Sequence, residues 1–391
     1  MIPDKLNLKE VVGVVGSGTM GAGIAQVSAT FGHKTFVFDT SQEAIEKAKS
    51  NLTSGLKRLL EKGKINSTEL DCISNNIQFT NTLDDFRNCS LVIEAIVENL
   101  EVKQKLFSDI EKIVSAGCVL ASNTSSLSIT SIASNAAKPD RVVGIHFFNP
   151  ATLMPLVEVV PGYSTSIEIP IKIKRLIESW NKVVVYAKDT PGFIVNRVAR
   201  PFYGESIRIY EEGMADFSTI DWIMRLNGFK MGPFELMDLI GNDVNYTVTE
   251  TVWKQFFNDP KYKPSITQKR LVEANRLGKK SGKGYYDYSS LIPEPNKNNP
   301  SIENIFNRIL CMLINEASDA LYYGVASRED IDLAMTRGVN YPKGLLKWAD
   351  EFGLEKVLSI LQNLYVQYGE ERYRPSILLK RMVEKGEKKF Y

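Results

Sequence analysis

A glycine-rich turn between two short apolar runs constrains the fold of this chain more than any other feature. Residues 11–15 (VVGVV) are small or β-branched, and the segment 16–21 (GSGTMG) follows at once. A helical stretch of small residues, 22–30, and a second apolar run, 34–38, come next. A strand, a helix and a strand within about 30 residues form a βαβ unit. We therefore expect two parallel strands joined by a crossover helix.

The glycines have the spacing of a dinucleotide-binding turn. Gly16 permits the tight turn, Gly18 lets the backbone approach a pyrophosphate, and Gly21 allows the helix to pack closely on the strand. Asp39, at the end of the second run, would bind the adenosine ribose and repel the 2′-phosphate of NADP. A glycine-rich turn in some other α/β protein is the alternative, which Asp39 disfavours. We predict NAD as the cofactor, bound by Gly16, Gly18, Thr19, Met20, Gly21 and Asp39.

The rest of the chain divides into an α/β part and a helical part. Further strand-like runs, with helical stretches between some of them, lie at 77–80, 91–94, 118–122, 142–146, 157–160 and 183–187. The pattern becomes helical after Thr190, a candidate N-cap, with Pro191 at the first helical position. We predict an α/β Rossmann-type domain (1–189) followed by two tandem all-α domains. These cover 190–290 and 301–391, and a Pro- and Asn-rich linker joins them.

The two helical domains are an internal repeat. A shift of 111 residues places Arg197 on Arg308 and Glu205 on Glu316. The same shift also aligns Asn196 with Asn307, Gly213 with Gly324, Asp221 with Asp332 and Met224 with Met335. The second copy keeps the asparagine but lacks the Pro-Gly that precedes it in the first, and it contains no histidine. We therefore predict a degenerate, catalytically silent second copy.

Composition argues against several classes of function. The net charge of +2 gives no electrostatic case for binding nucleic acid or a membrane surface. No run approaches 18 consecutive apolar residues, and the first residues carry no apolar signal segment. The four cysteines are scattered, without the spacing of a metal site, and are typical of reduced thiols. We expect a cytoplasmic protein without a bound metal.

One of the two histidines is a candidate catalytic base. His146 ends the apolar run 142–146, and Glu158 lies within a second such run, 156–160. If the two runs are neighbouring strands, the imidazole and the carboxylate can meet. A carboxylate that accepts from one ring nitrogen fixes the tautomer and stabilises the protonated ring, which prepares a general base. The alternative is a core histidine at a strand end, with an unrelated glutamate.

Several segments, in order, resemble one enzyme family. They are GSGTMGAGIAQ, EAIVEN, ASNTSSLSIT, HFFNP, DTPGFIVNR, MGPFELMDLIG and GKKSGKGYYDY. Over about residues 10–288 the chain resembles the L-3-hydroxyacyl-CoA dehydrogenases, of the 3-hydroxybutyryl-CoA dehydrogenase type. The tandem helical domain is similar to that of longer members and of multifunctional fatty-acid oxidation subunits.

The resemblance implies roles for individual residues. It makes His146 the general base with Glu158 as its partner, and it places Ser125 and Asn196 against the substrate 3-oxygen. It implies cofactor contacts for Glu98, Lys103 and Lys280, and contacts to CoA for Lys62 as well as Ser125. Gly55 departs from the pattern, because relatives carry a CoA-contacting serine there, and this puts the local geometry of CoA docking in doubt.

We therefore expect an NAD-dependent dehydrogenase of short-chain (S)-3-hydroxyacyl-CoA, such as 3-hydroxybutyryl-CoA. A 3-hydroxyadipyl-CoA dehydrogenase is the first alternative, and it would need a basic side chain at the acyl end of the pocket. A non-catalytic NAD-binding protein is a second. A sugar-nucleotide dehydrogenase would need a cysteine in the helical domain, and none lies between Cys118 and Cys311. The protein is expected to be a monomer or a homodimer, in which the second helical copy can replace a partner subunit.

Overall fold

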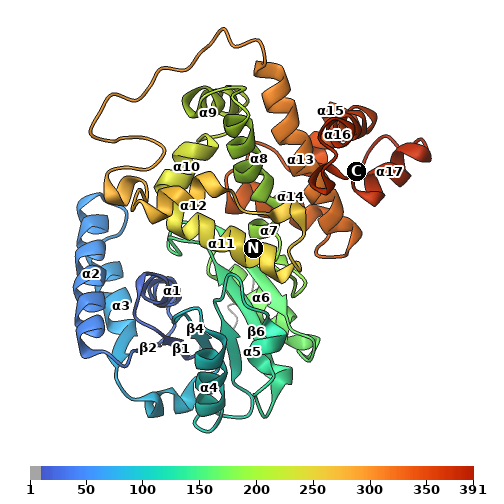
Figure 1. Ribbon diagram of the computed structural model, residues 1–391. Helices are drawn as coiled ribbons and strands as arrows, with labels where there is room; N and C mark the ends of the chain where they lie inside the picture. Colours follow the sequence, from blue (N-terminus) through green and yellow to red (C-terminus); the bar gives the residue numbers. More distant parts are fainter. Residues whose placement is uncertain (1–9) are drawn as a thin grey trace. The chain divides into compact units, whose positions relative to one another are not determined.

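The computed structural model describes residues 10–391, which form two compact units. The first unit ends at Asp189 and the second runs from Thr190 to Tyr391 (Figure 1). Residues 1–9, which we predicted to belong to the first domain, lie outside the described residues.

The first unit is built on one eight-stranded sheet among the described residues, in the order β3-β2-β1-β4-β5-β6-β7-β8. The strands are β1 (Val12–Val15), β2 (Thr35–Phe38), β3 (Ile77–Thr80), β4 (Leu91–Glu94), β5 (Val119–Ser122), β6 (Val142–Phe147), β7 (Leu156–Pro161) and β8 (Val183–Tyr186). Strands β1 and β2 pair in parallel, which confirms the predicted βαβ unit. Of the strands described in this sheet, only β6 and β7 pair antiparallel. The strand order reverses direction at β1, where open α/β sheets bind ligands beyond the carboxyl ends of the strands.

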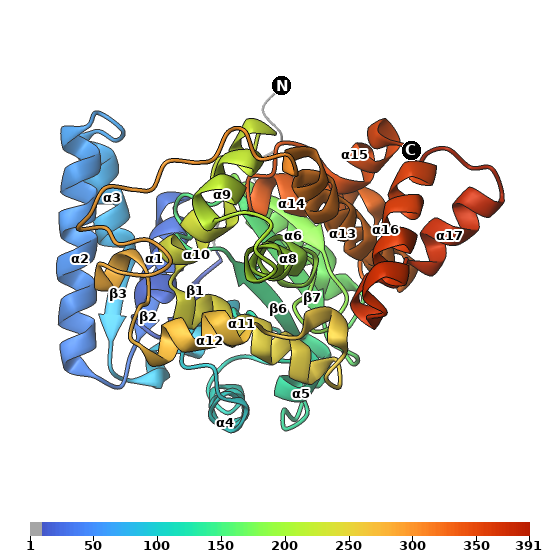
Figure 2. The same ribbon diagram turned by 45° about the horizontal axis from the view of Figure 1, so that its top comes forward.

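Helices complete this unit because each buries an apolar face. They are α1 (Thr19–Thr30), α2 (Gln42–Glu61), α3 (Ser67–Asn76), α4 (Leu100–Glu111), α5 (Ile129–Ala133) and α6 (Glu168–Ser179), with 3₁₀ turns at Leu83–Asn88 and Pro139–Arg141. The long lysine-bearing helix α2 begins where the Ser41 hydroxyl caps the Ala44 N–H. It runs beside α3, at the edge of the sheet (Figure 2).

The second unit is built mainly from helices. Its first copy contains α7 (Val195–Val198), α8 (Arg200–Glu211), α9 (Phe217–Leu226), α10 (Pro233–Ile240), α11 (Asn242–Gln255) and α12 (Ile266–Glu273), with 3₁₀ turns at Pro260–Tyr262 and Lys279–Ser281. Its second copy contains α13 (Ile302–Tyr322), α14 (Arg328–Gly338), α15 (Leu345–Phe352), α16 (Leu354–Tyr368) and α17 (Ile377–Glu384), with a 3₁₀ turn at Glu371–Tyr373.

The start of the first helical copy differs from the prediction. A helix beginning at Pro191 with Thr190 as its N-cap was expected, but α7 begins at Val195. Gly192 and Phe193 have φ angles of +74° and +47°, a left-handed conformation that an α-helix does not contain. The second copy has no Pro-Gly at this point, so α13 runs unbroken for 21 residues.

The two copies pack through equivalent residues. Helices α7 and α8 lie against α13, where Arg197 of α7 pairs with Glu316 at 2.6 Å and Arg308 pairs with Glu205 of α8. The shift of 111 residues aligns the two arginines with each other and the two glutamates with each other. The arginine of each copy therefore pairs with the glutamate of the other copy. Two tyrosines repeat the exchange, since Tyr262 donates to Glu316 at 2.6 Å and Tyr373 donates to Glu205 at 2.8 Å. Such reciprocal pairing is the pattern of an isologous, two-fold interface.

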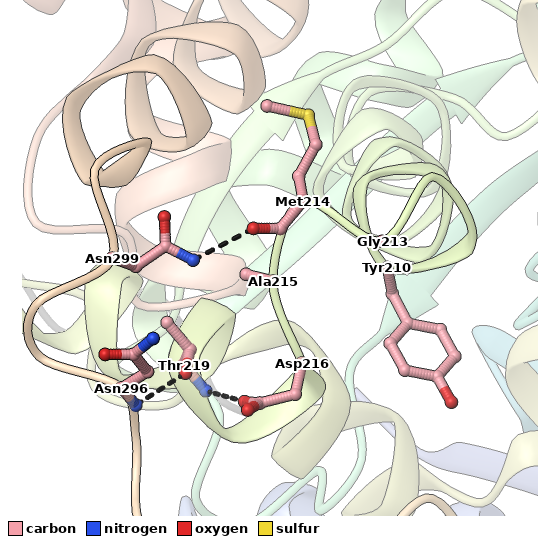
Figure 3. Close-up of a pocket in the computed structure, with 8 residues that line it drawn as sticks. All are labelled: Tyr210, Gly213, Met214, Ala215, Asp216, Thr219, Asn296 and Asn299. Carbon is pink, nitrogen blue, oxygen red and sulfur yellow. Dashed lines mark hydrogen bonds between the residues drawn. The ribbon is translucent and has the colours of Figure 1, made fainter.

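The linker between the copies is fastened to the first copy. The Asn296 N–H donates to the Thr219 hydroxyl at 2.8 Å, and the Asn299 amide donates to the Met214 carbonyl at 2.9 Å (Figure 3). A cavity of about 370 Å³ lies between the linker and the turn from α8 to α9, beside Tyr210 and Asp216. The Pro- and Asn-rich sequence therefore forms an ordered connection.

Candidate active site

The glycine turn after β1 brings backbone close to backbone. Gly16 has a φ of +100°, and a Cβ placed on it would lie 2.6 Å from the Ala95 carbonyl oxygen. A Cβ on Gly21 would lie 1.8 Å from the Gly16 carbonyl oxygen. Since real side chains do not approach so closely, α1 can begin directly beneath β1 only with glycine at these positions. The N-terminus of α1 then faces the cleft at the end of the strands.

Asp39 is held in position by the same turn. One of its carboxylate oxygens accepts from the Ser17 N–H at 2.9 Å and the Ser17 hydroxyl at 2.8 Å, and the other accepts from the Ser41 N–H at 3.0 Å. Partial burial opposes the charge, but these hydrogen bonds outweigh it and lower the pKa of Asp39. Asp39 is therefore a fixed anion. Sequence reasoning missed Ser17, although a hydroxyl residue between the glycines was visible.

A cleft of about 580 Å³ opens in front of Asp39. Its walls are mostly apolar, with charged residues at the edge, and include Gly16, Gly18, Phe38, Asp39, Leu83, Ile96, Val97, Val102, Lys105 and Leu106. Apolar walls, a fixed carboxylate for the ribose and a helix N-terminus for the pyrophosphate fit the adenosine half of NAD.

Lys103 lies inside a buried ionic cluster. Its ammonium contacts Glu94 and lies 3.2 Å from Glu98, while its side chain is 1% exposed. Glu94 ends β4, is fully buried, and also accepts from the Ser122 hydroxyl at 2.6 Å. Within this unit, Lys103 thus organises the two glutamates. Glu94 was missed by sequence reasoning because nothing in the pattern distinguishes a buried acid from an exposed one at a strand end.

Glu98 in turn organises the loop that carries Ser125. It accepts from the hydroxyls of Thr124 and Ser126 at 2.5 and 2.8 Å, and from the N–H groups of Ser125 and Ser126 at 3.2 Å each. Burial alone would raise the pKa of Glu98, but the Lys103 charge and these hydroxyls outweigh it and lower the pKa. Helix α5 begins after this loop, with Ser128 as its N-cap residue.

His146 and Glu158 face each other across β6 and β7. The two residues are register partners in the antiparallel pair. Nδ1 of His146 lies 2.6 Å from a Glu158 oxygen, and the two residues are 6% and 0% exposed. A direct hydrogen bond between buried side chains rules out the alternative of an unrelated glutamate. Nearby, the Phe147 N–H donates to the Asn123 side chain at 2.8 Å, which ties the end of β6 to the segment bearing Ser125.

The other histidine is structural. His33 is fully buried, its ring lies 5.6 Å from the Trp180 ring, and Nδ1 lies 3.0 Å from the Glu10 carbonyl oxygen. These contacts place it beside Trp180 in the hydrophobic core of the first unit. His146 is therefore the histidine suited to acid–base chemistry.

The remaining predicted residues lie apart from this pair or in the second unit. Lys62 is the exposed C-cap residue of α2, and a Cβ on Gly55 would meet open space. Asn196 lies on α7 in the second unit, and Lys280 in the same unit donates to Asp243 at 2.7 Å. Within residues 10–391 no acidic, histidine or cysteine side chains group into a possible metal site. None of the helices described over that range has the length and apolar content to cross a membrane.

Comparison with known proteins gives consistent matches. The model of the 3-hydroxyacyl-CoA dehydrogenase NAD binding domain matches residues 11–190, and that of the 3-hydroxyacyl-CoA dehydrogenase C-terminal domain matches residues 192–288 and 305–389. A 3-hydroxyadipyl-CoA dehydrogenase of Escherichia coli is 37% identical, with 96% of this chain and 98% of the relative covered. A probable 3-hydroxybutyryl-CoA dehydrogenase of Deinococcus radiodurans is 42% identical over 71% of this chain and 99% of its own.

Solved structures agree with these matches. The crystal structure of an Escherichia coli 3-hydroxybutyryl-CoA dehydrogenase superimposes with a TM-score of 0.91 at 36% identity, covering 97% of this chain and 99% of that one. The structure of (S)-3-hydroxybutyryl-CoA dehydrogenase PaaH1 from Ralstonia eutropha covers 71% of this chain and 98% of its own, with a TM-score of 0.69 and 37% identity.

Proposed function

Because this chain belongs to the 3-hydroxyacyl-CoA dehydrogenase family, whose members are NAD-dependent oxidoreductases, we propose that it interconverts short-chain (S)-3-hydroxyacyl-CoA and 3-oxoacyl-CoA with His146 as general acid and base. The observation that carries this proposal is the buried hydrogen bond between His146 and Glu158. It lies in the NAD-binding unit, at the ends of strands that border the Ser125 segment.

The residues divide the chemistry between them. NAD, when bound, supplies the acceptor for the hydride that leaves C3. Nδ1 of His146 donates to Glu158, so Nε2 is the nitrogen that takes the hydroxyl proton during oxidation and returns it during reduction. Glu158 stabilises the positive charge that the ring then carries. Ser125 and Asn196 are neutral donors that would orient the substrate oxygen and polarise it.

The NAD-binding residues are proposed from the geometry of the first unit. Asp39, fixed by Ser17 and Ser41, would bind the adenosine ribose, and the N-terminus of α1 at Thr19 and Met20 would face the pyrophosphate. Glu98 and Lys103 would shape the nicotinamide end of the cleft through the loop that they hold. Lys280 would contribute from the second unit, and Lys62 would bind the CoA phosphates.

Two substrates are candidates within this class. The relative from Deinococcus radiodurans and the solved structures bear the name of the four-carbon hydroxyacyl-CoA. The relative from Escherichia coli that covers 96% of this chain is named for 3-hydroxyadipyl-CoA, whose acyl chain has six carbons and a second carboxylate. This match over nearly the whole chain favours 3-hydroxyadipyl-CoA as the alternative substrate.

The state of assembly and the location are also proposals. The second helical copy covers the α8 face of the first with reciprocal ion pairs, so we expect a monomer. Three of the four cysteines are buried and all four are free, which fits the cytoplasm predicted from the sequence.

An absorbance assay tests the proposed activity. Purified protein is given NADH with acetoacetyl-CoA, then with longer 3-oxoacyl-CoA substrates, and NADPH replaces NADH in a parallel series. We expect NADH oxidation with acyl-CoA substrates, and at least about tenfold weaker use of NADPH because of the Asp39 charge. Absence of turnover with every 3-oxoacyl-CoA, under conditions where NADH binds, would refute the proposal.

A further inference from the structure

One arginine in the second unit is buried without an acid. Arg200 opens α8 and is 7% exposed. Among the described residues no carboxylate pairs with it, and Nη1 donates to the Thr249 hydroxyl at 3.0 Å. Its Nε has no hydrogen-bond partner. A buried charge that lacks a counterion is costly, so its presence calls for a reason.

The packing of the two helical copies does not supply that reason. The other buried cations at this interface are paired: Arg197 with Glu316, Lys261 with Glu316 and Asp319, and Arg308 with Glu205. The shift that relates these pairs places Arg200 on Cys311, an uncharged residue. Arg200 therefore has no counterpart in the second copy and does not take part in the reciprocal exchange.

The groups around the guanidinium are neutral and carry hydroxyls. The ring of Tyr203 lies 4.9 Å from the guanidinium carbon. Tyr341, whose ring lies 5.6 Å from that of Phe202, interacts electrostatically with Arg200, and its buried hydroxyl has no hydrogen-bond partner. Burial lowers the pKa of Arg200, as no carboxylate offsets the loss of water. One cation with nearby hydroxyl donors is the donor set that binds a carboxylate.

The spacing between Asn196 and Arg200 indicates what kind of carboxylate Arg200 could bind. Arg200 follows Asn196 by four residues, and Ala199 between them is in the right-handed helical region (φ −79°, ψ −9°). The two side chains therefore start about one helical turn apart, roughly 5.4 Å. In a six-carbon acyl chain, C6 lies three carbon–carbon bonds beyond C3, about 4 Å when extended. A chain with its 3-oxygen at Asn196 can thus bring a terminal carboxylate to Arg200.

We propose that Arg200, together with the hydroxyls of Tyr203 and Tyr341, binds the free carboxylate of a dicarboxylic (S)-3-hydroxyacyl-CoA with a six-carbon acyl chain. This inference rests on the proposed function, because it takes the 3-oxygen to be bound at Asn196. A monocarboxylic chain leaves the guanidinium buried without an anion. Sites built around a buried polar group discriminate strongly against substrates that lack the matching group.

The test compares two substrates of equal carbon number. 3-Hydroxyadipyl-CoA and 3-hydroxyhexanoyl-CoA differ by a carboxylate against a methyl group at C6. We expect kcat/KM of the full-length protein to favour the dicarboxylic substrate at least about tenfold. In Arg200→Met we expect the ratio of the two kcat/KM values to fall about 10- to 100-fold, the effect of losing a charge-assisted hydrogen bond. Arg200→Lys keeps the positive charge but loses the planar guanidinium that can bind a carboxylate with two hydrogen bonds. Its ratio of the two kcat/KM values should lie between those of the wild type and Arg200→Met.

A matched control lies on the same helix. Arg208 is partly exposed and lies 3.5 Å from Glu370, so Arg208→Met should leave the substrate ratio unchanged. A wild-type ratio near one, or equal losses for both substrates in Arg200→Met, overturns the inference while leaving the dehydrogenase activity in place. A wild-type protein that turns over neither substrate refutes the proposed function itself.

An inhibition experiment covers the case in which Arg200→Met does not fold. Adipyl-CoA and hexanoyl-CoA lack the 3-hydroxyl and should act as competitive inhibitors of the wild-type enzyme. We expect adipyl-CoA to inhibit at least about tenfold more strongly, because only it presents a carboxylate to Arg200. Equal inhibition constants would overturn the inference without any variant.

Discussion

At the scale of single residues, the first unit keeps one lysine almost wholly out of water. Lys103 contacts the buried Glu94 and lies 3.2 Å from Glu98, which in turn holds the Ser125 loop. The ammonium therefore supports two carboxylates with different surroundings. Its removal would leave Glu94 charged, buried and without its cation, a situation that destabilises proteins strongly.

We predict that Lys103→Met lowers the free energy of unfolding of the first unit by about 3–5 kcal/mol. Because the pKa of Glu98 is lowered, its carboxylate stabilises the fold at pH values above the ordinary pKa of a glutamate, and that contribution is lost as the pH falls through the lowered pKa. Without Lys103 the loss should begin at a higher pH. Urea denaturation from pH 3 to pH 8, read separately for the two units, measures both effects.

Lys112→Met is the matched control for this prediction. Lys112 caps the same helix, is largely exposed, and pairs with Asp109 at 2.9 Å. An exposed pair of this kind contributes at most about 1 kcal/mol. If the two variants unfold at the same urea concentration, the buried cluster does not stabilise the fold as described.

Sequence reasoning found part of this site and missed the rest for a physical reason. His146 and Glu158 stood out because a titratable residue inside an apolar β-run is rare. Ser17 and Glu94 did not stand out, because their roles depend on which atoms they face once β1 pairs with β2 and β4 pairs with β5. Arg200 lay in a helical pattern where an arginine is ordinarily solvated, and only its burial makes it exceptional.

At the scale of elements, the close approach of α1 to β1 depends on Gly21. We predict that Gly21→Ala weakens NADH binding by at least about tenfold, because the added Cβ would lie 1.8 Å from the Gly16 carbonyl and α1 must move. Fluorescence titration of NADH measures the affinity, and thermal melting shows whether the unit remains folded.

Gly55→Ala is the control within the same unit. Gly55 lies inside α2, and a Cβ there meets no atom within 4 Å. Alanine stabilises a helix interior relative to glycine by up to about 1 kcal/mol, so this variant should melt at a slightly higher temperature with unchanged NADH affinity. Equal NADH affinity in Gly21→Ala and Gly55→Ala would show that close packing of α1 against β1 is not required for NADH binding.

The elements themselves followed well from the sequence. The predicted strands of the first unit all lie within one residue of the observed bounds, because β-branched runs between Gly, Pro and polar segments mark buried strands clearly. The antiparallel pairing of β6 and β7 was not predicted, although the short connection between them, residues 148–155, leaves too little chain for a parallel crossover. The predicted helix start at Pro191 was wrong because Thr-Pro is only a local signal for a helix N-terminus. The positive φ of Phe193, which interrupts a helix there, is imposed by the surrounding structure.

At the scale of the whole molecule, the second helical copy stands where a partner subunit could stand. A chain that ends at Ser290 loses Glu316, so the buried Arg197 and Tyr262 lose their acceptor. The reciprocal pattern means that Glu205 of another truncated chain can replace it. The relative from Deinococcus radiodurans covers 71% of this chain and 99% of its own length, so a chain truncated here is comparable in length with that relative.

We predict that the full chain sediments as a monomer and that the chain ending at Ser290 sediments as a dimer. Charge reversal at Arg197 in the shorter chain should prevent the dimer, because Glu205 of the second molecule would then face a like charge. A truncated chain that stays monomeric, soluble and fully active would show that the second copy does not replace a partner.

The proton transfer assigned to His146 is tested most directly by steady-state kinetics of His146→Gln with acetoacetyl-CoA and NADH, beside a fluorescence measurement of NADH affinity. The hydrogen bond to Glu158 and the position at the end of β6 predict a fall in kcat of about 10²- to 10⁴-fold with nearly unchanged NADH affinity. A variant that keeps more than about a tenth of the wild-type kcat would contradict the assignment of His146 as the general acid and base.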